Sequence, residues 1–169
     1  RAFPDLVAGF AGAYAGAPAL VARPRDAAEL VRVLTVALAA LQAGRSPLIY
    51  SAAGPDDPAV TTFAAQAQAA GLSVAEASAR VGEALAETMR RLVATSGVRR
   101  LAIAGGDSSG AVASALDIAA LTVAAQLVPG APLCRVWSDA PGMDGMEVVL
   151  KGGQMGQADF FGRVLHGTV

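Results

Sequence analysis

A stretch rich in glycine, acidic and hydroxyl residues follows a short apolar run at residues 101–104. That run has the length and apolarity of a buried strand, and it leads into residues 105–110, with the sequence GGDSSG. Glycines there would let a ligand approach the backbone closely, and Asp107, Ser108 or Ser109 could cap a helix that begins nearby. Since unpaired N–H groups at a helix start attract anions, the stretch predicts a phosphate-binding turn. The alternative is a tight turn and a capped helix, with no ligand.

A second glycine-rich turn lies near the end of the chain, next to a lysine. An apolar run at residues 146–151 predicts a strand, which ends in Lys151 and is followed by Gly152 and Gly153. A lysine at the mouth of such a turn can neutralise a phosphate as a point charge. The alternative is a surface lysine at a strand end, with the phenylalanines at 160–161 as core anchors.

The spacing of these glycines departs from the common nucleotide-binding motifs. G-x-x-x-x-G-K-[ST] would need a lysine after Gly110, where an alanine stands. G-x-G-x-x-G fails because Gly105 and Gly106 are adjacent. These residues therefore form neither a Walker loop nor a dinucleotide-binding fingerprint, and a phosphate site here must be of another kind.

Residues 106–110 do match G-x-S-x-G, a pattern that places a serine nucleophile between a strand and a helix. Ser108 would then be the nucleophile of a serine hydrolase, with Asp139 or Asp144 and then His166 in the chain order of an α/β-hydrolase triad. Against this hypothesis, His166 is the only histidine and no HGGG-type oxyanion loop accompanies it. The serine hydrolase stays open as an alternative.

Helices and strands are expected to alternate along the chain that carries these turns. Apolar periodicity and capping signals predict helices at residues 26–44, 58–70, 73–97 and 111–121, and another from Asp159. Compact apolar runs predict strands at residues 47–52, 101–104 and 146–151, with a rigid turn at 128–132. This alternation favours an α/β fold, a three-layer sandwich with a mostly parallel central sheet and helices on both faces. Ligands bind beyond the carboxyl ends of such strands, where Gly105 and Gly152 are both expected.

Composition narrows the class of protein further. A chain of 169 residues predicts one domain, and 54% hydrophobic with 16% charged residues is enough for a real core. No apolar stretch of about 20 residues is free of charge, so we expect no membrane partner. A net charge of −1 without a basic block argues against nucleic acid. The single Cys134 has no disulfide or metal-ligand companion, no metal site is expected, and the absence of a visible secretory signal predicts a cytoplasmic protein.

Taken together, the two glycine turns resemble the four-carbon acid sugar kinase family, in its C-terminal nucleotide-binding domain. That family carries G-G-[ED]-[TS]-S/A-G after a strand, then P-G-x-P, then L-K-S-G-N-F-G-x-x-D-F-F; residues 105–110, 129–132 and 150–161 follow in the same order. The resemblance is specific from about Arg99 onward. It implies that the phosphates or ribose of ATP are contacted by Gly105, Gly106, Asp107, Ser108 and Gly153, with Lys151 as a neutralising charge.

The chain departs from the family pattern at several of these positions. The family's first strand ends in a G-S-x-S-like turn, whereas residues 9–12 match it without either hydroxyl and leave Gly12 as the candidate contact. Glycine replaces the usual serine at Gly152, and Gln154 and Met155 replace asparagine and phenylalanine. Each lost hydrogen bond to a phosphate costs about 1.5–3 kcal/mol, or roughly one to two decades in affinity. A degenerate, non-catalytic α/β binding module is therefore a second alternative.

The resemblance also implies a function and what the function still requires. Residues 1–169 would be a single nucleotide-binding domain, without the family's N-terminal domain that binds the sugar acid. The implied enzyme is a kinase of carbohydrate metabolism that transfers the γ-phosphate of ATP, with Mg²⁺, to a hydroxyl of a four-carbon sugar acid such as erythronate, threonate or an oxo-derivative. The chain alone is expected to be inactive, its catalytic residues stay unassigned, and a homo-oligomer is an open expectation.

Overall fold

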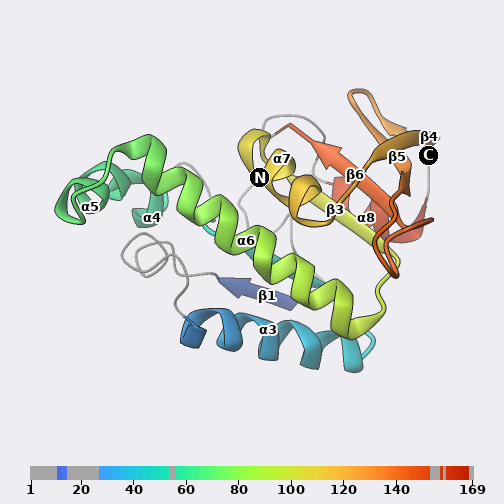
Figure 1. The fold of residues 1–169 in the computed structure, drawn as a ribbon, viewed down its shortest axis with the longest axis horizontal. Helices are drawn as coiled ribbons and strands as arrows, with labels where there is room; N and C mark the ends of the chain where they lie inside the picture. The colour runs from blue at the N-terminus through green and yellow to red at the C-terminus, as the bar shows by residue number, and fades with distance from the viewer. Residues whose placement is uncertain (1–10, 15–26, 54–55, 153–156, 158, 168–169) are drawn as a thin grey trace.

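Two β-sheets organise the part of the chain that the computed structural model describes, which is residues 11–14, 27–53, 56–152, 157 and 159–167 (Figure 1). The smaller sheet pairs β1 (Ala11–Tyr14) with β2 (Pro47–Tyr50) in parallel. The larger sheet has the strand order β3-β6-β5-β4, and its members are β3 (Arg100–Ala104), β4 (Ala120–Val128), β5 (Ala131–Trp137) and β6 (Glu147–Lys151).

Six helices are described, and most of them lie where the sequence predicts. They are α3 (Ala27–Gln42), α4 (Pro58–Thr61), α5 (Phe63–Ala69), α6 (Val74–Ser96), α7 (Gly106–Ala115) and α8 (Phe160–His166). The helix expected at 58–70 is divided into α4 and α5 at Thr62. The expected capping signals of α6 are confirmed, because the Ser73 hydroxyl accepts from the Glu76 N–H, the Glu76 carboxylate accepts from the Ser73 N–H, and Gly97 ends the helix in the left-handed conformation. Asp26, the expected cap of α3, lies outside the described residues.

Helices cover both faces of the larger sheet, as the sequence predicts. On one face α6 and α7 pack on a core that includes Leu101 and Val148, and on the other α8 packs on a core that includes Leu133 and Val149. Helix α6 also contacts α3, so it runs between the two sheets and belongs to both cores (Figure 1). The α/β class and the layered arrangement are therefore confirmed. No helix among the described residues is long and apolar enough to cross a membrane.

The expectation of a mostly parallel sheet is wrong, because a β-hairpin occupies part of the larger sheet. Strands β4 and β5 are antiparallel, β5 and β6 are antiparallel, and only β3 and β6 are parallel. The helix expected at 111–121 is also misplaced, since α7 begins at Gly106 and ends before Asp117, whose φ is +50°. Gly130, with φ +77°, makes the tight turn between the two hairpin strands. A tight hairpin reverses the chain, so these neighbours cannot be parallel.

Candidate functional site

The two glycine turns leave the larger sheet side by side. In the parallel register of β3 and β6, Ala104 lies opposite Lys151, and the Gly105 N–H donates to the Lys151 carbonyl at 2.9 Å. Both turns therefore begin at the carboxyl end of a parallel strand pair, where the sequence places them. We call this end of the sheet, formed by Gly105, Gly106, Lys151 and Gly152, the glycine edge.

Gly105 makes the sharp change of direction from β3 into α7. Its φ of 126° and ψ of 138° lie in a region that residues with a side chain rarely adopt. Its carbonyl accepts from the Ser109 N–H at 3.1 Å and from the Ser109 hydroxyl at 2.5 Å. Gly105 is thus the N-cap position of α7, and the expectation of a cap at Asp107 is wrong because Asp107 lies inside the first turn. The first N–H groups of α7 have no acceptor within the helix, and they carry the positive end of its dipole.

Gly106 lacks a side chain at a place where the protein does not require that absence. A Cβ added there would meet no heavy atom within 4 Å, and its φ is not in the left-handed region. A glycine costs a helix about 1 kcal/mol relative to alanine, so this position is unfavourable for folding alone. The missing side chain instead leaves the first turn of α7 open to close approach by a ligand.

Lys151 supplies a buried positive charge at the end of β6, beside α8. Its side chain is only 9% exposed, and its Nζ donates to the Gly152 carbonyl at 2.9 Å. The same Nζ lies 5.5 Å from the ring centroid of Phe160, the first residue of α8, which is itself buried. Burial lowers the pKa of Lys151. The ammonium is therefore held at the glycine edge and is not the surface lysine of the alternative interpretation.

The contribution of Phe160 was missed at the level of sequence, where this residue was expected to be a core anchor. It does pack in the core, and its ring also touches the edge of the Phe161 ring, with centroids 5.3 Å apart. Its position beside Lys151 depends on α8 folding back across the sheet, which no local pattern encodes. In the sequence, the signal for this contact is a lysine at a glycine-rich turn, followed a few residues later by two adjacent aromatic residues.

The other residues expected at the site divide into three groups. Gly12 lies within β1, paired with Leu48, and so belongs to the smaller sheet instead of the glycine edge. Gly153 lies outside the described residues. Asp107 and Ser108 are in the first turn of α7, but the described part of the structure does not extend to their side chains. For these four residues, the role in binding therefore stays a prediction.

The residues of the hydrolase alternative lie at opposite ends of the larger sheet. Ser108 follows the carboxyl end of β3, whereas α8 runs back so that the Val164 carbonyl accepts from Arg100, the first residue of β3, at 3.0 Å. His166 is thus at the other end of a five-residue strand, about 16 Å long. Asp144 is also at that end, because its carbonyl accepts from Arg99 at 2.8 Å. The structure does not bring a serine hydrolase triad together.

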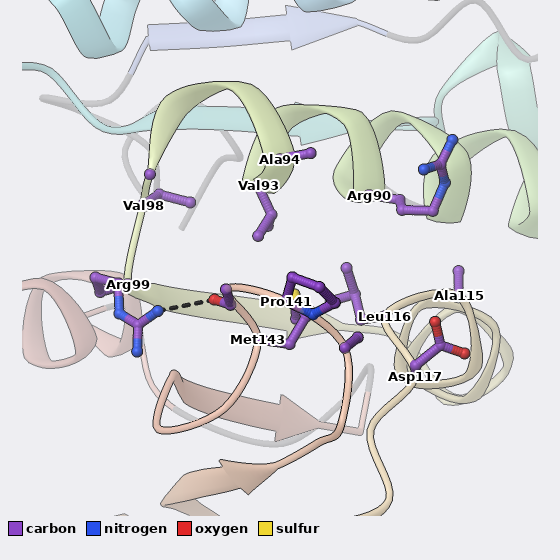
Figure 2. Close-up of a pocket in the computed structure, with 13 residues that line it drawn as sticks. Arg90, Val93, Ala94, Val98, Arg99, Ala115, Leu116, Asp117, Pro141 and Met143 are labelled. Atoms are coloured by element: carbon purple, nitrogen blue, oxygen red, sulfur yellow. Dashed lines mark hydrogen bonds between the residues drawn. The ribbon is translucent and has the colours of Figure 1, made fainter.

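That opposite end, which we call the arginine edge and define by Arg99, Arg100 and Glu147, borders a pocket. The pocket has a volume of about 350 Å³ and lies between the ends of α6 and α7 and the loop at residues 140–143 (Figure 2). Its lining is mainly apolar, with Val93, Leu116 and Met143 among its residues, and Arg90, Arg99 and Asp117 at its rim. Figure 2 shows Arg99 turned toward the loop, where it donates to the Gly142 carbonyl at 2.8 Å. This pocket is therefore away from the glycine turns.

No group of three or more His, Cys, Asp or Glu side chains that could hold a metal ion occurs among the described residues. The free Cys134 is buried in the core, and burial raises the pKa of its thiol. The chemistry that the glycine edge offers is therefore binding by backbone N–H groups and one ammonium.

Comparison with known proteins gives a consistent set of relatives. A family model described as "nucleotide-binding C-terminal domain" matches residues 13–161. The 3-oxo-isoapionate kinase of Paraburkholderia graminis is 58% identical over 143 residues, which cover 85% of this chain and 30% of that protein. The 3-oxo-tetronate kinase of Pseudomonas savastanoi pv. phaseolicola is 37% identical over 149 residues, 88% of this chain and 32% of that protein. The chain thus spans about a third of the length of these relatives.

Solved structures show the same fold at low sequence identity. A crystal structure of a Haemophilus influenzae protein of the DUF1537 family has a TM-score of 0.77 and 19% identity, covering 98% of this chain and 37% of that one. A DUF1537 structure from Bordetella bronchiseptica, described as a domain-swapped dimer with bound citrate, has a TM-score of 0.61 and 21% identity, covering 92% of this chain and 34% of that one.

Proposed function

Because the chain belongs to the four-carbon acid sugar kinase family, as its nucleotide-binding C-terminal domain, we propose that the glycine edge binds the phosphates of ATP. The observation that carries this proposal is the hydrogen bond from the Gly105 N–H to the Lys151 carbonyl, because it joins the start of α7 to the backbone of a residue whose ammonium is buried. Helix N–H groups and a lysine are complementary to phosphate oxygens in both charge and geometry.

The residues at and around the glycine edge have separate tasks in this proposal. Gly105 turns the chain, Gly106 leaves room for a phosphate against the first turn of α7, and Lys151 balances the phosphate charge. The N–H groups of Asp107 and Ser108 would donate to phosphate oxygens, and Gly153 and Gly12 would complete the nucleotide contacts. Phosphoryl transfer depends mainly on such positioning and charge neutralisation.

Mg²⁺ would reach the site with the nucleotide. The described residues hold no cluster of carboxylate, histidine or cysteine side chains that fits the ion on its own. When bound, Mg²⁺ neutralises charge on the β- and γ-phosphate oxygens.

The acceptor is proposed to be a hydroxyl group of an oxidised sugar acid with a short carbon chain. Two relatives are named 3-oxo-isoapionate kinase and 3-oxo-tetronate kinase, and the 58% identical one is the former. This chain would supply the nucleotide half of the enzyme, and the part of those relatives that it does not match would bind the acceptor. The chain alone is therefore proposed to bind ATP without phosphorylating the acid, in the cytoplasm where ATP is available.

The competing proposal is a folded module that no longer binds nucleotide. Two observations favour it: residues 9–12 lack both hydroxyls of the family's turn, and Gly152 offers no hydroxyl at the glycine edge. Weak or absent nucleotide binding by an intact fold would follow from those losses.

Calorimetric titration with ADP and ATP, in the presence of magnesium, separates these proposals. The decisive variant is Gly106→Val, whose Cβ meets no heavy atom within 4 Å and whose side chain would occupy the space next to the first turn of α7. Its matched control is Gly110→Val, because Gly110 lies one turn further along α7 and is equally free of close neighbours. We expect saturable binding by the wild type and the control, and at least a tenfold loss in Gly106→Val. No binding at millimolar nucleotide by a folded chain, or equal binding by Gly106→Val, would overturn the proposal.

A further inference from the structure

The outermost strand of the larger sheet, β4, is uncharged and largely exposed. It is the last strand in the order β3-β6-β5-β4, and no described strand pairs with its outer side. Its nine residues read ALTVAAQLV, and the sequence carries no charged residue from 118 to 134. Edge strands normally carry charges or prolines that prevent pairing with another chain. This strand carries neither kind of protection.

Apolar residues on one face of β4 continue the core that α6 and α7 cover, but they lie beyond the part that these helices cover. Leu121 and Val123 lie opposite Val136 and Cys134 of β5, which are buried in the core beneath α6 and α7. Leu121 is nevertheless 38% exposed and Val123 57% exposed. The apolar surface of the core therefore continues to the outer edge of the sheet and meets water there.

The other face carries the only tryptophan of the sequence. Trp137 lies opposite Ala120 in the register of β4 and β5, and it is 52% exposed. Its Nε1 donates to the Thr122 hydroxyl at 2.7 Å, so the ring is held against β4. A fixed, half-exposed tryptophan is a common anchor of protein interfaces.

We propose that β4 pairs with β4 of a second copy of this chain, in antiparallel orientation across a two-fold axis. A strand without charge is complementary to itself, since a second copy brings neither a like-charge contact nor an unpaired charge into the interface. When the pairing is centred on Thr122, the exposed segment 120–124 pairs with itself, and Leu121 lies opposite Val123 of the partner subunit. The two four-stranded sheets then form one continuous sheet, in which the backbone N–H and C=O groups at both exposed edges are hydrogen-bonded.

This interface is independent of the proposed nucleotide site. Strand β4 is separated from β3 by both β6 and β5, whereas the glycine edge lies at the ends of β3 and β6. Pairing through β4 therefore leaves the glycine edge uncovered. The failure of one proposal does not imply the failure of the other.

Sedimentation velocity of the purified chain, from micromolar to submillimolar concentration, tests the interface with Val123→Lys. A lysine on an edge strand opposes pairing, and the native side chain is already exposed, so the fold tolerates the change. The matched control is Val31→Lys on α3, where the valine is 56% exposed. We expect a concentration-dependent dimer for the wild type and for Val31→Lys, at least tenfold weaker association for Val123→Lys, and unchanged ADP binding in all three.

A second measurement identifies the surface that associates. Trp137 reports on it directly, so its emission should shift to shorter wavelength as the wild-type concentration rises, and should stay constant in Val123→Lys. Amide hydrogen exchange along β4 should slow under the same conditions. A wild-type chain that stays monomeric over the whole concentration range would overturn the proposal. A dimer whose affinity is unchanged in Val123→Lys would also overturn it.

Discussion

The glycine edge and the arginine edge lie at opposite ends of the same parallel strand pair, yet their polar groups are arranged in opposite ways. At the arginine edge, long side chains satisfy the backbone: Arg99 donates to the carbonyls of Gly142 and Asp144, both at 2.8 Å. Arg100 forms an ion pair with Glu147 at 2.6 Å. At the glycine edge, side chains are missing where the backbone turns, and the charged side chain that the structure describes there is the buried Lys151.

This difference explains why the pocket and the proposed site do not coincide. Arg99 directs two of its five N–H donors to protein carbonyls, which adds stability, and the hollow beside it offers mainly apolar contact. Glycine in a helix start reduces stability and leaves N–H groups accessible. Sites of binding are commonly the less stable parts of a fold, and the glycine edge follows that pattern.

The largest effect is expected from Gly105→Ala. A side chain at φ 126° and ψ 138° strains the turn, so the free energy of unfolding should fall by about 1–3 kcal/mol. Urea denaturation followed by circular dichroism measures the change. Gly106→Ala is the control, because its Cβ has open space and alanine favours a helix, so it should not lower the midpoint. Equal urea midpoints for Gly105→Ala and Gly106→Ala would contradict the expected difference in backbone strain between the two positions.

A somewhat smaller effect is expected at the other end of the sheet, from Arg100→Met. This change leaves Glu147 without its ion pair and the Val164 carbonyl without the donor at 3.0 Å. Because the guanidinium is about one-third exposed, the loss should be about 1–2 kcal/mol in the free energy of unfolding. Arg163→Met, which breaks the exposed pair with Asp159, should cost less than about 0.5 kcal/mol. Loss of ADP binding in Arg100→Met would contradict the separation of the two edges.

Lys151→Met should change stability little but binding strongly. Methionine keeps the volume while removing a buried charge, so the free energy of unfolding at neutral pH should shift by less than about 1 kcal/mol. ADP affinity should fall at least tenfold, as calorimetry would show.

The same variant tests the direction in which the contribution of Lys151 to stability changes with pH. Burial lowers the pKa of Lys151 below its ordinary value of 10.5, so between the folded and unfolded pKa values the unfolded chain binds more protons. The stability of the wild type relative to Lys151→Met should therefore rise as pH increases toward 10.5. A relative stability that falls over this range would mean that the ammonium is favourably paired in the fold.

The smallest effect is expected from Glu87, which lies on α6 near the arginine edge. Arg90 at 2.8 Å and Arg91 at 2.6 Å lower the pKa of its carboxyl to about 2. A depressed pKa means that the stabilising contribution is present above about 4.5 and is lost as pH falls toward 2. Because these groups are exposed, the difference between wild type and Glu87→Gln should stay below about 1 kcal/mol. Urea denaturation at neutral pH and near pH 3 measures it, and a difference that grows in acid would contradict the expectation.

Sequence reasoning succeeds where local chemistry determines the structure. The capping box of Ser73 and Glu76 and the terminal Gly97 encode the limits of α6 within a few residues of each end. The turns after β3 and β6 are likewise local, because apolar runs end at glycines. Their meeting at one edge follows once two strands are taken as parallel neighbours, and the register of Ala104 with Lys151 agrees.

The failures concern segments whose structure depends on distant partners. Residues 118–125 are rich in alanine and suit a helix or a strand, and the pairing of β4 with β5 decides between them. The Pro129-Gly130 pair is a hairpin signal that was interpreted only as a rigid turn. The bond between Arg100 and Glu147 joins residues 47 positions apart. No local pattern therefore predicts the side-chain hydrogen bonds of the arginine edge.

The position of β6 has a consequence for how the protein is made. Of the four strands of the larger sheet it is synthesised last, yet it lies inside the sheet, between β3 and β5. On the ribosome, the β4–β5 hairpin can form as soon as Trp137 emerges, whereas β3 has no neighbour in that sheet until Glu147–Lys151 arrives. A nascent chain paused before this point exposes two open strand edges, which are prone to intermolecular pairing. Completion of the sheet is thus a single late insertion, and until it occurs the edges that β6 will cover stay open to other chains.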